Sequence, residues 1–239
     1  GFGASYSDKA GQIVAGNTFD YPSVHGKAVL AAGHPFFSCS NETFTEDSTF
    51  RREAWTIDLI CGKQVTTRVG RKDYFTVFTP EIQNCINRFA ASGGNVLVSG
   101  AYIGTDLEDS IYPVDKDSLS RTQAIKFAKD ILGYRYITNR ASRNGRITSV
   151  KGGPCNGIDG ELMTEMNSVS YCVESPDGIA PANPGGKTIC RYSDSGISAG
   201  IAYQGKGYRT VCLGFPVEAM TNDIEIENTI RTILEYFEK

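Results

Sequence analysis

The sequence predicts one α/β domain with a mostly parallel, doubly wound sheet and an antiparallel extension from its second half. Three features support this: apolar runs that stop at a glycine, amphipathic helices between them, and a glycine-rich second half broken into short strand-like runs. Strands that alternate with helices favour a parallel sheet covered by helices on both faces. A chain of 239 residues can bury a large core as a single domain.

The central strands are predicted from three apolar runs. These are Lys27–Ala32, Trp55–Cys61 and Asn95–Ser99. The first ends at Gly33 and the second at Gly62, as strands that lead into tight turns do. The third run has three large apolar residues in succession, Val96 to Val98, which is typical of a strand buried on both faces.

Three amphipathic helices are predicted from their capping signals. The first begins after Thr79, a residue type that caps helices, and ends before Gly93. The second runs from Leu119 to Leu132. The third begins at Asn222, where Glu225 completes a capping-box arrangement.

The second half is rich in Gly, Pro, Ser and Asn, and its short apolar runs indicate hairpin strands. The runs are Val169–Val173, Lys187–Tyr192, Ala199–Tyr203 and Tyr208–Leu213. We expect them to extend the sheet or to form a β subdomain. Residues 1–20 are polar and glycine-rich, so we expect this segment to be partly irregular.

Composition excludes several classes of partner. The net charge of -3 arises from 24 basic and 27 acidic residues that are interspersed, so there is no basic stripe for nucleic acid. No apolar run reaches the roughly 18 residues that a membrane span needs. The seven cysteines form no CxxC pair and no ligand spacing with His25 or His34, so we expect no metal and no cofactor.

The segment Gly100-Ala101-Tyr102-Ile103-Gly104 follows a predicted buried strand and resembles the nucleophile elbow of class I glutamine amidotransferases. That elbow reads Gly-x-Cys-x-Gly, with glycines that allow a sharp turn beside backbone N–H groups. The resemblance implies a flavodoxin-like three-layer sandwich. It also places Tyr102 where the family has its cysteine nucleophile, and a phenol is a poor substitute.

The second signature of that family is a strand followed by Phe-His-Pro-Glu, which supplies the base and its orienting carboxylate. The similar stretch here has Phe215 in place of the histidine, and Glu218 lies one position away from the carboxylate. A nucleophile without a base is not activated. The resemblance therefore implies that glutaminase activity has been lost.

A closer resemblance covers most of the chain. The stretches that carry it are residues 15–22 with His25-Gly26, and residues 57–64, 93–100 and 214–218. They are similar to the C-terminal domain of large exported bacterial proteins labelled xanthan-lyase-like or cell-wall-amidase-like. Because the chain begins with Gly rather than Met, we expect it to be part of a longer protein. The resemblance implies export, a glycan or cell-wall polymer as ligand, and packing against other domains of the same chain.

The functional crevice of such a sheet lies beyond the carboxyl ends of its strands. We expect the binding residues there: Gly100, Tyr102, Gly104, His34, Gln64 and Glu218. The favoured function is a noncatalytic module for ligand binding or interdomain packing. The alternative is a carbohydrate-active lyase or hydrolase whose site lies at the strand ends around Tyr102.

Four residues are candidates for the chemistry of that alternative. Tyr102 with His34 or His25 could form the acid and base of a lyase, and Asp106 could be a glycosidase carboxylate. Each also has a structural interpretation: Tyr102 packs over the turn, and Asp106 interacts with a helix dipole. His25 would then fix a loop through hydrogen bonds to the backbone.

Overall fold

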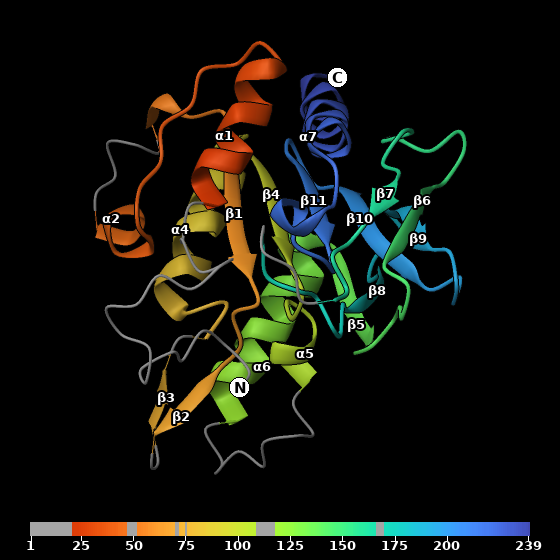
Figure 1. The fold of residues 1–239 in the computed structure, drawn as a ribbon. Helices are drawn as coiled ribbons and strands as arrows, with labels where there is room; N and C mark the ends of the chain where they lie inside the picture. The colour runs from red at the N-terminus through yellow and green to blue at the C-terminus, as the bar shows by residue number, and fades with distance from the viewer. Residues whose placement is uncertain (1–20, 47–51, 70–71, 75, 109–117, 166–169) are drawn as a thin grey trace, which may run out of the picture.

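Figure 1 shows the fold in a computed structural model, which describes residues 21–46, 52–69, 72–74, 76–108, 118–165 and 170–239. The expectation of an irregular segment over residues 1–20 lies outside this part. None of the described helices is long and apolar enough to cross a bilayer.

A curled, mixed sheet of seven strands forms the centre of the molecule. In spatial order its strands are β1 (Thr56–Gly62), β4 (Asn95–Gly100), β11 (Arg209–Leu213), β10 (Ser198–Gln204), β9 (Gly186–Tyr192), β6 (Arg146–Ser149) and β7 (Gly160–Glu161). The β1–β4 and β4–β11 pairs are parallel, whereas the four pairs from β11 to β7 are antiparallel.

The predicted flavodoxin-like, mostly parallel three-layer sandwich is therefore wrong. The sequence of the second half indicated hairpins, but these strands continue the main sheet and outnumber its parallel part. Because β9, β10 and β11 follow one another through short turns, they can pair only antiparallel. Two small sheets accompany the main one: β2 (Thr67–Val69) with β3 (Lys72–Tyr74), and β5 (Tyr134–Thr138) with β8 (Gly178–Pro181).

Helices cover the two faces of β4 and β11. The elements are α1 (Tyr21–Ala31), α2 (Asn41–Glu46), α4 (Pro80–Ala91), α5 (Thr105–Glu108), α6 (Ser118–Phe127), the π-helical turn η2 (Ala128–Leu132), the 3-10 turn η3 (Val217–Ala219) and α7 (Asp223–Glu238). Helix α1 lies beside α7 (Figure 1), and their core contains Leu97 of β4. Val96 and Val98 point the other way, into the core formed with α4 and η2.

Most of the elements predicted from local signals are present. The predicted helices correspond to α4, to α6 with η2, and to α7, and the runs Trp55–Cys61 and Asn95–Ser99 correspond to β1 and β4. Lys27–Ala32 is helical rather than extended, because a short apolar run does not distinguish a strand from a buried helical turn. The described residues 170–173 form no strand.

Candidate functional site

The chain makes a tight turn from β4 into α5 at residues 101–104. The backbone N–H of Ala101 donates to the carbonyl of Gly62, at 2.8 Å. A Cβ atom at Gly100 would lie 2.7 Å from the Cβ of Cys61, and one at Gly104 would lie 2.9 Å from Cδ2 of Tyr136. Close packing on both sides therefore requires a glycine at each end of the turn.

Tyr102 lies inside this turn and is only 4% exposed. It belongs to the core that α1 and α7 cover. Burial raises the pKa of its phenol well above the ordinary value, and the nearby carboxylates of Glu174 and Asp177 raise it further. Tyr102 therefore keeps its proton at neutral pH and is not prepared to act as a base.

Asp106, in α5, binds the backbone of two other segments, at Thr66 and at Val77. Its carboxylate accepts hydrogen bonds from the backbone N–H groups of Thr66, at 2.5 Å, and Val77, at 3.0 Å. Burial raises its pKa, and these hydrogen bonds oppose the increase. Both oxygens are engaged with the chain itself, so the geometry gives Asp106 a structural role.

A second buried carboxyl group, Asp177, closes the turn from the other side. It accepts hydrogen bonds from the N–H groups of Gly104, at 2.6 Å, and Thr105, at 2.7 Å, and from the Thr105 hydroxyl at 2.5 Å. Burial raises its pKa to about 7, against the effect of these bonds. The sequence carried no sign of this contact, because Asp177 follows the turn by more than 70 residues.

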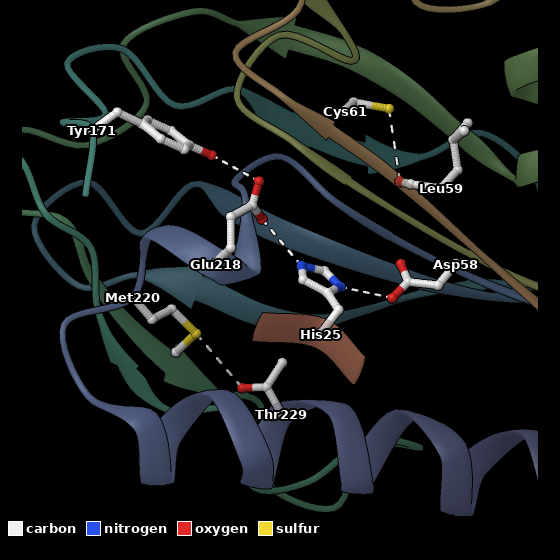
Figure 2. Close-up of polar contacts among 8 residues, drawn as sticks. All are labelled: His25, Asp58, Leu59, Cys61, Tyr171, Glu218, Met220 and Thr229. Atoms are coloured by element: carbon white, nitrogen blue, oxygen red, sulfur yellow. Dashed lines mark hydrogen bonds and ion pairs between the residues drawn. The ribbon is translucent and has the colours of Figure 1, made fainter. Parts of the chain in front are cut away.

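His25, on α1, joins two carboxylates at this end of the sheet. Its Nδ1 lies 2.6 Å from Oδ2 of Asp58, and its Nε2 lies 3.1 Å from Oε2 of Glu218. The Tyr171 hydroxyl donates to the other oxygen of Glu218, at 2.8 Å. Figure 2 shows the four side chains as a continuous chain of contacts from β1 to the segment that contains Tyr171.

Electrostatics keep His25 protonated. Burial by itself would lower its pKa, but the carboxylates of Asp58 and Glu218 outweigh this effect and raise the pKa to about 10. The imidazolium therefore donates from both nitrogens at neutral pH. The expectation that His25 bonds to backbone is wrong. The sequence does contain one signal for a buried polar contact here: Asp58 is a charged residue in the middle of an otherwise mostly apolar strand.

This network is poorly placed for chemistry. His25 is 2% exposed and Glu218 is 4% exposed, and both nitrogens of the imidazole are occupied. The thiol of Cys61 is also buried, and desolvation raises its pKa well above the ordinary value, so a reactive thiolate is not favoured. Within the described residues, no group of three or more His, Cys, Asp or Glu side chains is arranged to hold a metal ion.

The structure separates His34 from the other predicted residues. Its Nε2 lies 3.4 Å from Oε1 of Glu238, and its ring centroid is 5.4 Å from that of Trp55. Trp55 precedes the amino end of β1, whereas Tyr102 follows the carboxyl end of the parallel strand β4. A strand of this length spans about 20 Å, so His34 cannot act with Tyr102.

The remaining predicted residues do lie at the carboxyl ends of the strands. Gln64 follows β1, and its side-chain N–H donates to the carbonyl of Thr76, at 3.1 Å. Glu218 approaches the end of the same strand, since a Cβ atom at Gly62 would lie 3.6 Å from its Oε1. His34 was expected there because the helix that precedes it was predicted as a strand.

Comparisons with known proteins found similarity among solved structures. No family model and no curated protein matches the chain. The cold-adapted β-galactosidase from Rahnella sp. R3 is similar with a TM-score of 0.53 and 12% identity, over 92% of this chain and 27% of that one. Gan42B, a GH42 β-galactosidase, is similar with a TM-score of 0.51 and 11% identity, over 97% of this chain and 28% of that one.

At this identity the likeness concerns the fold alone. The chain spans little more than a quarter of the length of either β-galactosidase. Both similar structures are glycosidase chains, so the comparison also gives no support to the flavodoxin-like sandwich expected from the sequence.

Proposed function

We propose that this chain is a noncatalytic, glycan-binding module of a larger carbohydrate-active protein. Its fold is similar to part of two β-galactosidases, and it spans only 27% and 28% of their chains. A module of this size would leave the bond-breaking chemistry to another part of the protein. The predicted export belongs to the same proposal, as does the predicted resemblance to domains of polysaccharide- or cell-wall-processing proteins.

One observation supports a noncatalytic role above all. The polar side chains at the carboxyl ends of the strands bond to one another and to the backbone, and those of Tyr102, His25 and Glu218 are at least 96% buried. A general acid or base must reach the substrate within hydrogen-bond distance. Here a glycosidic oxygen would first have to displace the core.

Glycan binding is supported by aromatic side chains that reach solvent. Trp55 is 40% exposed, Phe36 is 44% exposed and Phe37 is 49% exposed. Large aromatic faces of this kind provide apolar contact area at a low cost in conformational entropy. All three lie outside the buried network, so a ligand could bind without disturbing it.

The test is a glycan-array measurement on the chain. We expect saturable binding to at least one class of glycan. We expect the same binding from Tyr102→Phe, because that phenol lies in the core. A chain that binds no glycan would contradict the proposal and would favour a domain that serves only interdomain packing.

A carbohydrate-active hydrolase is the second candidate, and the similarity of the fold to part of two β-galactosidases is the observation in its favour. The carboxyl group that such a site would use is Asp177, beside the turn after β4, where burial, with a further contribution from Asp106, raises its pKa to about 7. Release of reducing sugar by the chain, lost in Asp177→Asn and retained in His34→Ala, would favour this candidate.

A further inference from the structure

A groove lies at the end of the sheet opposite the His25 network. Its larger part is a hollow of about 660 Å³ between the segment that precedes β1 and the end of α4. Its lining residues are Arg52, Ala54, Trp55, Arg88, Phe89, Ser92, Gly93 and Gly94. This volume is typical of small-ligand sites.

Trp55 gives the groove an aromatic wall. It is one of the exposed large apolar side chains of the described part, and the ring of His34 contacts it with centroids 5.4 Å apart. His34 is in turn held by Glu238 at the end of α7. The indole thus contacts the His34 ring while part of it stays open to solvent, as a platform for a sugar ring needs to be.

Two arginines give the groove a positive charge. Arg52 and Arg88 are both exposed, and no described carboxylate lies within ion-pair distance of either. Arg88 donates one hydrogen bond, from Nη2 to the Cys85 sulfur at 3.5 Å, so its remaining donors are available. The end of α4 contributes roughly half a negative charge, and the adjoining part of the groove holds one carboxylate, that of Glu81. The two guanidinium groups outweigh both.

The groove continues past Arg88 along α4. A second hollow, of about 350 Å³, shares Arg88 and is lined by Thr45, Glu81, Asn84, Cys85 and Asn87. The side-chain oxygen of Asn87 is buried and has no hydrogen-bond partner within the described residues. The two hollows together offer an aromatic face, two cations, amide groups and one carboxylate, that of Glu81.

We propose that this groove binds an acidic oligosaccharide, a chain of hexuronic acid units. The carboxylates bind Arg52 and Arg88 through charge-assisted hydrogen bonds, one sugar ring stacks on Trp55, and hydroxyl groups bond to the exposed side chain of Asn84. This inference rests on the proposed glycan-binding function and names the site and the class of ligand.

Isothermal calorimetry on the chain tests it with tri-galacturonate, the neutral galactotriose and citrate. Tri-galacturonate should bind, with an affinity that falls as salt is added. Arg52→Gln, Arg88→Gln and Trp55→Ala should each weaken it by roughly tenfold or more. Arg143→Gln, an exposed arginine beside the distant strand β6, is the matched control and should leave it unchanged. Equal thermal midpoints show that each variant is folded.

Three results would overturn the inference. These are binding of galactotriose or citrate as tight as that of tri-galacturonate, equal affinities in the groove variants and the control, and no binding of tri-galacturonate. The proposed function fails separately, when the glycan array detects no ligand at all. An array ligand that binds equally well to the groove variants would leave that function standing and place its site elsewhere.

Discussion

His25 joins segments that lie far apart in the sequence. It is 33 residues from Asp58 and 193 residues from Glu218, and Tyr171 completes the contacts. A buried charge is tolerated only when it is paired and hydrogen-bonded. The imidazolium of His25 is paired and hydrogen-bonded with the carboxylates of Asp58 and Glu218, so the three groups meet that condition together.

His25→Ala should therefore destabilise the chain strongly. It leaves the buried carboxylate of Glu218 and the partly exposed carboxylate of Asp58 without their common partner, and removing one member of a buried ion pair costs about 3–5 kcal/mol. Urea unfolding gives the free energy directly. The other histidine is the matched control: His34 and Glu238 are partly exposed, so His34→Ala should cost less than about 1 kcal/mol. Equal losses in the two variants would contradict a special role for His25.

The same network predicts how stability depends on pH. The pKa of His25 is about 10 in the folded chain and 6.5 as its ordinary value. The folded state thus binds the proton more tightly, so the stabilisation is complete below pH 6.5 and is lost as pH rises towards 10. The difference in unfolding free energy between wild type and His25→Ala should shrink between about pH 6 and about pH 9. A difference that grows with pH would contradict the assignment.

At the scale of elements, local signals were reliable where capping and periodicity agreed. Helix α4 begins after Thr79, whose hydroxyl accepts a hydrogen bond from the N–H of Ile82 at 3.3 Å, as predicted. Helix α7 begins after Asn222, but Glu225 does not complete a capping box. Its carboxylate instead accepts a hydrogen bond from the N–H of Glu161, at 3.2 Å, so a tertiary contact replaced the local one.

Asn222→Ala should weaken α7 by about 1 kcal/mol, because the side-chain oxygen accepts from the N–H of Ile224 at 2.9 Å. Asn222→Asp keeps this acceptor and should unfold at the same denaturant concentration as the wild type. Chemical denaturation of the two variants is the measurement. An alanine variant as stable as the aspartate variant would show that the cap contributes nothing.

For the whole molecule, local sequence patterns do not predict which strands pair or in which direction. Strand β11 pairs in parallel with β4 on one side and antiparallel with β10 on the other, and nothing in its own residues indicates that double role. The same limit applies to the site. Glu218 was predicted from a motif, but its partners His25 and Tyr171 come together only through the fold.

The strand predicted over Lys27–Ala32, which is helical in the structure, also led to a wrong placement of both histidines. Because Lys27–Ala32 was predicted as a strand, His34 was expected beside Tyr102 and His25 in a loop. The helix instead carries His25 into the network and leaves His34 with Trp55 at the opposite end. The two ends of the sheet thus separate a buried, structural set of polar residues from an open groove.

Binding of glycan without cleavage distinguishes the proposed module from a hydrolase. The most direct measurement incubates the chain with the glycan it binds most tightly and determines the length of the recovered glycan by mass spectrometry. We expect a saturable complex and a glycan of unchanged length, with wild type and with Asp177→Asn. Shortened products formed by the wild type and missing with Asp177→Asn would contradict it and place an active site at the turn after β4.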